Sequence, residues 1–386
     1  MMMMSKKDNL HSSMQFQNFE LEYFQSQFER TVEYNLADSS VKCLSTREWL
    51  SEEEAEQLLS TGLFYPEVNG TGLLRERIAA LYPGATANNV LVTVGAAQAN
   101  CMVVSTLLER GDEVIVVSPG YRQVWGLAKN LGCNVKELQL LPEENWRLNL
   151  DRLAAMTSDK TKLIAIVNPN NPTGTVLAPD EMKQVVETCE RSGAWLHADE
   201  VYRGTEFHGV ETPSFWGQYD KLICTNSLSK AYGLAGLRIG WAVAAPEMVG
   251  ELWRRHEYAV IAAAGPSMTL AEIALQPEKR AMLLQRQREL SRNGHAVLEK
   301  WIAQQEGRFS LHKPVATSIA FVRYYFDMPS VELVDYLRKN ASVLVAPGAY
   351  LGTEHHLRIT VGYDTAKVET ALSRISAAIA ELAIAV

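Results

Sequence analysis

Short apolar runs alternate with helical stretches through the middle of the chain. The runs predict strands at 90–94, 113–117, 135–140, 163–167, 194–198, 222–225 and 239–244, and the stretches between some of them predict helices at 98–109, 121–131, 179–191 and 247–258. This alternation is typical of βαβ units, so we predict an α/β fold with a mixed, mostly parallel sheet that helices cover on both faces. In such sheets ligands bind at the carboxyl ends of the strands.

The segments on either side have a different pattern. Phe16, Phe19 and Tyr23 in the stretch 15–34 favour a packing helix, and 35–40 is typical of an extended arm or turn. A helix is predicted over 45–59, with a restart at Ser51 because Ser51 and Glu54 fit a capping box. After about residue 275 we expect a long charged helix at 276–305, then segments at 318–322, 331–340, 343–346 and 357–361 and a helix from Ala366, which together form an α+β unit.

These patterns divide the chain into four parts. We expect a disordered tail at 1–13, an N-terminal arm at 14–45, a large domain at 46–275 and a smaller C-terminal domain at 276–386 that packs with the arm.

The composition of the chain narrows the range of possible functions. The 386 residues include 37 Lys+Arg and 45 Asp+Glu, a net charge of −8 without a basic run, which disfavours a nucleic-acid partner. Five cysteines without a CxxC motif indicate a reduced, cytoplasmic protein. No apolar run approaches the roughly 20 residues that span a membrane, and His355-His356 lacks further ligands at metal spacing, so neither a membrane nor a metal is expected.

The stretch 227–241 carries the candidate chemistry. Lys230 lies among small and apolar residues between two predicted strands, where desolvation would lower the pKa of its amine and favour Schiff-base chemistry. An ordinary surface lysine is the alternative. Ser227, Ser229 and Arg238 favour the functional interpretation, because two hydroxyls and a guanidinium can together bind a dianion.

The pattern Ser-x-Ser-Lys-x-x-Gly-x-x-Gly-x-Arg-x-Gly resembles the lysine segment of fold type I, pyridoxal 5′-phosphate (PLP) dependent enzymes of aminotransferase class I/II. The resemblance implies that Lys230 forms the internal aldimine with PLP and acts as general acid–base. It also implies that Ser227, Ser229 and Arg238 hold the cofactor phosphate.

Four more motifs follow predicted strands and match the same family. By resemblance, the turn Gly95-Ala96-Ala97 binds the phosphate, Tyr121 stacks on the pyridine ring, and Asn171 of the string NPNNPTG bonds the phenolic oxygen. Asp199 would pair with the pyridinium nitrogen, and Tyr202 would donate to the phenolic oxygen. Taken singly, each motif could be a plain turn, a packing tyrosine or a helix cap.

Three further residues have roles outside the strand ends. The resemblance implies that Tyr65 crosses a homodimer interface to the partner's phosphate, and that Arg358 binds the substrate α-carboxylate. Asp38, in the arm, could select a cationic amino acid. The alternative for Asp38 is that it caps a turn through Ser40.

The family implies an aminotransferase that moves an amino group from an L-amino acid to a 2-oxo acid. The motifs do not separate this activity from PLP-dependent elimination, replacement or cyclisation, and some strings resemble capreomycidine synthase-like members, which handle an arginine derivative. A non-catalytic regulator of the same fold is disfavoured, because the N-terminal segment is too short and acidic for a DNA-binding domain.

Overall fold

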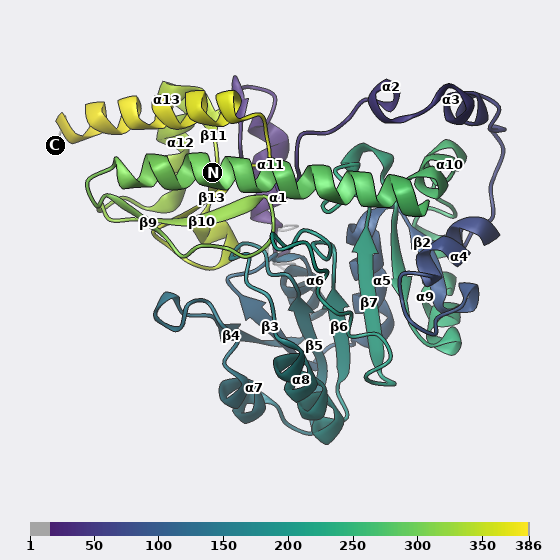
Figure 1. Ribbon diagram of the computed structural model, residues 1–386. Helices are drawn as coiled ribbons and strands as arrows, with labels where there is room; N and C mark the ends of the chain where they lie inside the picture. Colours follow the sequence, from purple (N-terminus) through teal and green to yellow (C-terminus); the bar gives the residue numbers. More distant parts are fainter. Residues whose placement is uncertain (1–15, 385–386) are drawn as a thin grey trace, which may run out of the picture.

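The computed structural model describes residues 16–384, and its largest element is a seven-stranded sheet (Figure 1). The strand order is β2-β8-β7-β6-β5-β3-β4, and β8 alone in this sheet runs antiparallel to its neighbours. The predicted mixed, mostly parallel sheet is therefore confirmed. Its strands are β2 (Val90–Thr93), β3 (Glu113–Ser118), β4 (Asn134–Gln139), β5 (Thr161–Val167), β6 (Trp195–Asp199), β7 (Leu222–Ser227) and β8 (Gly240–Val243).

Helices cover both faces of this sheet. Side chains alternate along a strand, so in β3 Ile115 packs on one face while Val114 and Val116 pack on the other. The Ile115 face carries α4 (Gly72–Ala79), α8 (Pro179–Ser192) and α10 (Gly265–Ala274). The opposite face carries α5 (Gly95–Leu107), α6 (Gln123–Leu131) and α9 (Pro246–Ala259). The short helix α7 (Leu150–Met156), which the sequence pattern did not predict, begins at the cap Asn149.

A smaller antiparallel sheet forms the C-terminal unit. Its order is β12-β13-β10-β9, and α12 (Ser330–Ala341) and α13 (Thr365–Ile384) contribute to its core. Leu21, Phe24 and Leu36 of the arm are buried in the same core. The strands are β9 (Phe309–Leu311), β10 (Ile319–Tyr324), β12 (Ala346–Pro347) and β13 (His356–Thr360).

The long helix α11 (Pro277–Ala303) joins the two units (Figure 1). Leu283 and Leu284 pack in the core of the large sheet, whereas Leu298 and Trp301 pack in the core of the small one. The helix begins where the boundary at 276 was predicted but belongs to both cores. The four-part division stays a prediction, and its tail at 1–13 lies outside the described residues.

Four elements differ from their predicted extents. The arm helix is shorter, α1 (Glu20–Phe28), and the arm then forms β1 (Tyr34–Asn35), which pairs in parallel with β11 (Val343–Leu344). The segment 343–346 is thus divided between two sheets. The helix predicted over 45–59 is divided into α2 (Thr46–Trp49) and α3 (Glu52–Leu59), because Leu50 is extended and Ser51 caps α3 in the predicted capping box with Glu54. Helix α5 begins three residues earlier than predicted, at Gly95.

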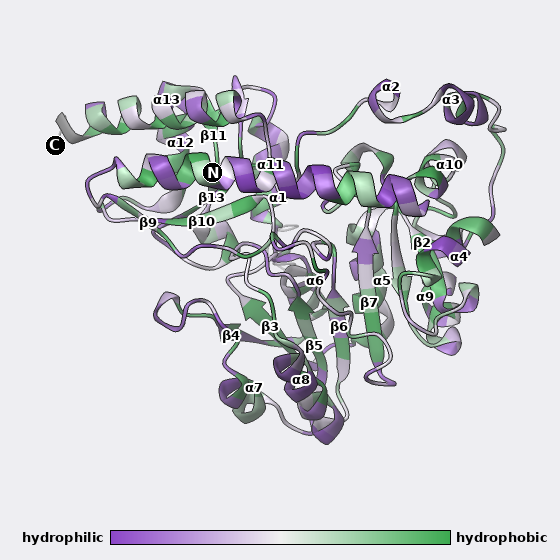
Figure 2. Ribbon diagram, in the orientation of Figure 1, coloured by the Kyte–Doolittle hydropathy of each residue, from purple (hydrophilic) through white to green (hydrophobic). Residues whose placement is uncertain are grey.

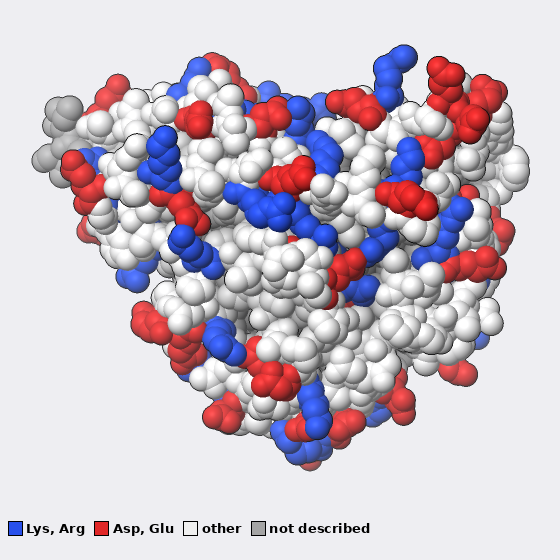
Figure 3. Space-filling view, in the orientation of Figure 1, with Lys and Arg blue, Asp and Glu red and all other residues white. Residues whose placement is uncertain are grey.

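The distribution of hydrophobic, polar and charged residues over the structure agrees with the composition of the chain. Figure 2 shows hydrophobic residues concentrated in the strands of the large sheet and many polar residues on α8 and α11. Basic and acidic side chains intermix on the face in Figure 3. Among the residues with described placement, no helix has the length and apolarity needed to cross a membrane.

Candidate active site

Five loops meet at the carboxyl edge of the large sheet. Strands β2, β3, β5, β6 and β7 run in one direction, so the segments that follow them share one edge. These segments carry the residues that the sequence singled out: Gly95, Ala96, Ala97, Tyr121, Asn171, Asp199, Tyr202, Ser227, Ser229 and Lys230. A cavity at this edge is lined by residues that include Asn100, Tyr121 and Asp199.

Lys230 faces the N-terminal arm. Its Nζ donates a hydrogen bond to Ser39 Oγ at 2.8 Å, and Tyr202 donates its hydroxyl to the backbone oxygen of Ser39 at 3.4 Å. Burial lowers the pKa of the Lys230 amine, and the carboxylates of Asp38 and Glu22 partly oppose this effect. The sequence predicted an arm beside the site, but no motif indicated Ser39 as the partner of Lys230.

Hydrogen-bond donors gather in a corner where β7, β8 and α5 meet. Arg238 Nη1 lies 3.4 Å from Ser229 Oγ, and Ser229 N donates to Ser227 Oγ at 3.2 Å. Gly95 opens α5 with φ of +71°, and a Cβ there would come within 2.5 Å of Arg238 Nη2. The glycine therefore lets the guanidinium approach the first turn of α5. The backbone N–H groups of this turn, including those of Ala96 and Ala97, have no acceptor within the helix.

Asp199 is a buried carboxylate at the end of β6. Asn100 Nδ2 donates to Oδ2 at 3.0 Å, and Val201 N donates to Oδ1 at 3.2 Å. Burial raises the pKa of Asp199 to about 6, although these hydrogen bonds and Lys230 oppose the shift. No Lys, Arg or His among the described residues lies within ion-pair distance of it. A cationic ligand group would thus be a favourable partner.

Two tyrosines are close to this carboxylate. Tyr121 lines the same cavity as Asp199, donates its hydroxyl to Glu22 Oε1 at 3.1 Å and packs edge-on against Phe19. Burial raises the pKa of Tyr202 to about 12. Both phenols are therefore protonated at neutral pH and can donate hydrogen bonds. Glu22 was predicted to lie in a packing helix, and its contact with Tyr121 was not foreseen.

Arg358 is a buried cation in β13, with 1% of its surface exposed. Nη1 donates to Asn171 Oδ1 at 3.2 Å and Nη2 donates to the Ala37 backbone oxygen at 2.7 Å. Nε has no hydrogen-bond partner, and no carboxylate of residues 16–384 lies within ion-pair distance. A buried guanidinium in this state is suited to a carboxylate ligand.

Tyr65 and Asp38 are the two remaining candidate residues, and their surroundings differ from those of the residues above. Tyr65 is 79% exposed, in the segment between α3 and α4, and makes no side-chain hydrogen bond to the other candidate residues. Asp38 Oδ1 accepts from Ser40 N at 3.0 Å, which is the turn contact of the alternative interpretation, and Oδ2 accepts from the Tyr363 hydroxyl.

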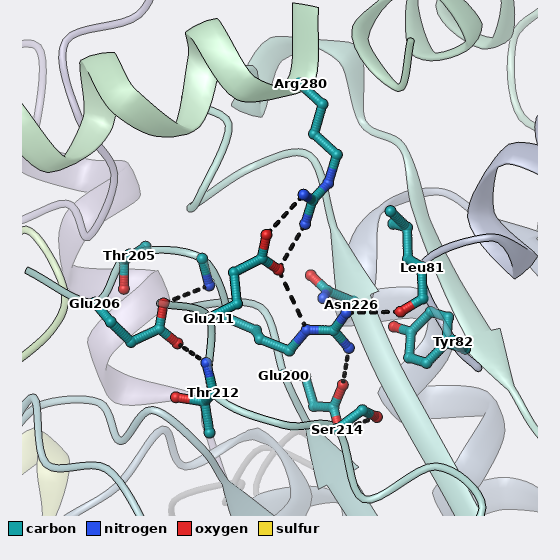
Figure 4. Close-up of polar contacts among 12 residues, drawn as sticks. Leu81, Tyr82, Glu200, Thr205, Glu206, Glu211, Thr212, Ser214, Asn226 and Arg280 are labelled. Carbon is teal, nitrogen blue, oxygen red and sulfur yellow. Dashed lines mark hydrogen bonds and ion pairs between the residues drawn. The ribbon is translucent and has the colours of Figure 1, made fainter. Parts of the chain in front are cut away.

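A polar network supports the two loops that carry Asp199 and Lys230 (Figure 4). Arg203 contacts Glu200, the neighbour of Asp199, at 3.1 Å and Glu211 at 3.7 Å. Arg280 of α11 makes two bonds of 2.7 Å to Glu211, and its Nε donates to the Tyr232 hydroxyl at 3.1 Å. The buried charges are thus paired, as a stable interior requires. The network ties the long helix to both of these loops.

Taken together, the site has a definite charge pattern. Arg238 and the start of α5 suit an anion, Asp199 suits a cation, and Arg358 suits a carboxylate, while the Lys230 amine lies at the same sheet edge. A ligand with an anionic group and a protonated ring nitrogen, together with an amino acid, fits this pattern.

Comparisons with known proteins agree with the chemistry. The family model for aminotransferase class I and II matches residues 33–375. The chain is 30% identical over 307 residues to capreomycidine synthase of Streptomyces vinaceus, covering 80% of this chain and 78% of that protein. It is 33% identical over 195 residues to an arginine–pyruvate transaminase of Pseudomonas aeruginosa, covering 49% of this chain and 50% of that protein.

A solved structure extends the likeness over nearly the whole fold. A PLP-dependent aminotransferase from Streptococcus suis superposes with a TM-score of 0.89 at 30% identity, covering 95% of this chain and 99% of that one. The chain therefore belongs to the aminotransferase class I and II family and is a fold type I, PLP-dependent aminotransferase that acts on an amino acid and a 2-oxo acid.

Proposed function

We propose that Lys230 binds PLP covalently and moves the proton at the substrate Cα. The observation that carries this proposal is the position of its amine, whose pKa burial lowers, at the sheet edge that also holds the buried, unmatched charge of Asp199 and that Arg358 of β13 reaches through Asn171. An amine with a lowered pKa is more often neutral near pH 7, so it can accept a proton. When bound, PLP supplies a ring that withdraws electrons from Cα.

Other residues would hold the cofactor. Asp199 pairs with the pyridinium nitrogen, Tyr121 packs on the ring, and Tyr202 and Asn171 bond its hydroxyl. The phosphate lies at the first turn of α5, where the Gly95 φ of +71° and the approach of Arg238 Nη2 support an anion site. Its ligands are Gly95, Ala96, Ala97, Ser227, Ser229 and Arg238, and in a dimer also Tyr65 of the other subunit.

Arg358 would orient the substrate. Its unpartnered Nε and the adjoining Nη2 can bind the two oxygens of an α-carboxylate, while Nη1 holds Asn171.

Product analysis separates transamination from the alternatives. Amino donors incubated with the holoenzyme should yield the matching 2-oxo acid and pyridoxamine phosphate. An alkene-derived or cyclic product would instead favour elimination or a reaction of the kind that the name of the capreomycidine synthase relative denotes.

We further propose a donor with a cationic side chain. Asp38 and Glu22 of the arm both act on the Lys230 amine, and Glu22 has no cationic partner among the described residues. Arg238, Asp199 and Arg358 are matched by the phosphate, the ring and the α-carboxylate, so Glu22 is the carboxylate left for the side chain. The relative named arginine–pyruvate transaminase supports this class. Asp38 contributes less to this selectivity, because its carboxylate already accepts hydrogen bonds from Ser40 and Tyr363.

Glu22→Gln tests this selectivity. Glutamine keeps an oxygen acceptor for the Tyr121 hydroxyl but removes the charge, so kcat/KM for arginine and lysine should fall about 10-fold, the equivalent of ~1.5 kcal/mol for a charged hydrogen bond. The loss should be mainly in KM, and leucine should be unaffected. Glu20→Gln on the same helix is the control, and Asp38→Asn should have a weaker effect. A preference for glutamate or leucine in the native enzyme would refute the cationic class.

We propose a homodimer that shares its active sites. An apolar surface around 59–65 and 258–261 is exposed in the single chain, with Leu63 at 90%, Phe64 at 78% and Tyr258 at 96% exposure. The first segment is joined to α10, the helix that follows the second segment, because Thr61 and Thr269 bond at 3.0 Å. Such a surface is typical of an interface between copies, and Tyr65 lies within it.

Sedimentation should report a dimer for the native protein. The double variant Leu63→Glu/Phe64→Glu should sediment as a monomer with little activity, because burying two carboxylates in an apolar interface is unfavourable. Val210→Glu, at an exposed valine of another loop, is the matched control. A fully active monomer would exclude shared sites.

The five cysteines are all free, which supports a reducing, cytoplasmic location.

A further inference from the structure

A buried line of hydrogen bonds runs from His197 to Asp199. His197 Nε2 lies 3.0 Å from Thr225 Oγ1, Thr225 Oγ1 lies 2.9 Å from Asn100 Oδ1, and Asn100 Nδ2 lies 3.0 Å from Asp199 Oδ2. His197 and Asp199 are two residues apart on β6, so they point to the same face, and Thr225 is the register partner of Asp199 on β7. All four side chains are at least nine-tenths buried.

The donor inventory fixes the direction of every bond. An ionised carboxylate only accepts, so Asn100 presents its amide nitrogen to Asp199 and its oxygen to Thr225. Thr225 has one hydroxyl hydrogen and donates it to Asn100, which leaves only a lone pair for His197. The His197 ring therefore donates from Nε2. Burial lowers its pKa to about 4, so the ring is neutral at pH 7.

A second contact holds the Asn100 amide in the same orientation. Its other hydrogen is donated to Gln123 Oε1 at 3.2 Å, and Gln123 Nε2 in turn donates to the Ala97 backbone oxygen at 2.7 Å. In the line itself, His197, Thr225 and Asn100 each donate a hydrogen bond in the direction of Asp199. Hydrogen bonds aligned in this way polarise one another.

We propose that Asn100 is the positioning residue of Asp199 and that, aligned by Thr225, His197 and Gln123, it keeps the Asp199 carboxylate ionised and oriented toward the cofactor nitrogen. This inference rests on the proposed role of Asp199. The sequence motifs indicated none of these contacts, because Asn100 lies on the second turn of α5 within an apolar stretch.

Several other groups act on the same carboxylate. The Val201 amide and the Lys230 cation favour its ionised form, whereas burial and the Glu200 carboxylate oppose it. Tyr121 and Tyr202 are near enough for Asp199 to raise the pKa of their phenols. Of the side chains that favour ionisation, Asn100 is the one that bonds Asp199 directly, so its removal should raise the pKa of Asp199.

The test is a titration of Asp199 in the apoprotein. Infrared spectra over pH 4–9 report the protonated carboxyl band, and Asp199 is identified as the signal that Asp199→Asn lacks. Asn100→Leu should move the midpoint upward by about one pH unit, a tenfold change in the proton equilibrium. Thr225→Val should move it in the same direction by less. Asn89→Leu removes an amide that bonds the Ala244 backbone oxygen at 3.0 Å, at the opposite end of β2, and should leave the midpoint unchanged.

Cofactor binding supplies the second readout. Since a protonated carboxyl pairs poorly with a cation, a midpoint that moves from about 6 to about 7 should lower the affinity of Asn100→Leu for PLP about twofold at pH 7 and nearly tenfold at pH 5, and the affinity should recover as the pH rises to 9. An unchanged midpoint in folded Asn100→Leu, or in Thr225→Val if the leucine variant does not fold, would overturn the proposal. If Asp199→Asn itself binds PLP and transfers amino groups normally, the proposed role of Asp199 fails, while the midpoint shift still tests Asn100.

Discussion

Replacing Lys230 with alanine is expected to lower the rate of amino transfer by about 10⁴-fold or more, since the variant loses both the covalent anchor and the proton-transferring amine. From the hydrogen bonds around Lys230, we expect the alanine variant to fold normally. Lys230 makes one hydrogen bond, to Ser39, and the neighbouring Ser40 hydroxyl still donates to the Ser229 backbone oxygen at 2.7 Å.

Single-turnover kinetics measure this loss without interference from product release. Lys221→Ala is a matched control on the same segment, because Lys221 is exposed and bonds only the Gly193 backbone oxygen. Small soluble amines added at high concentration should restore part of the proton transfer. If Lys230→Ala kept a tenth of the native rate, another group would have to carry the proton.

Asp199→Asn should have the second-largest effect, between about 10²- and 10⁴-fold, the equivalent of the roughly 3–5 kcal/mol that one partner contributes to a buried ion pair. Asparagine is nearly isosteric, so the loss would come from the charge rather than from packing. Asp220→Asn changes an exposed carboxylate before β7, at the opposite end of the sheet, and should be silent.

The pH dependence adds an independent check on Asp199. Its pKa in the unliganded protein is raised to about 6, above the usual 3.8, so the carboxylate is ionised above pH 6 and becomes protonated below it. PLP affinity should therefore weaken as the pH falls through about 6. In Asp199→Asn this dependence should disappear, and its persistence would assign the titration to another group.

The parts predicted from the sequence are those with local signals. Most strands of the large sheet are apolar runs, the edge strand β4 being mixed, and most candidate residues follow a strand within a few positions, as Lys230 follows β7 and Asn171 follows β5. Parallel strands then bring these loops together without any further information.

The parts that were missed depend on tertiary contacts. Ser39 meets Lys230 across 191 residues, and the Ala37 backbone oxygen meets Arg358 across 321. Asn100 reaches Asp199 only because α5 packs on the sheet next to β7. The break at Leu50, by contrast, had a local signal, because Ser51 and Glu54 form the predicted capping box at the start of α3.

The most direct test of the central claim is to locate the cofactor on the chain. The purified holoenzyme is treated with borohydride, which fixes a Schiff base irreversibly, and is then digested and sequenced by mass spectrometry. The account predicts one pyridoxyl group per chain, on Lys230, and none after prior conversion to the pyridoxamine phosphate form. A pyridoxyl group on a different lysine, or a protein that takes up no PLP, would contradict it.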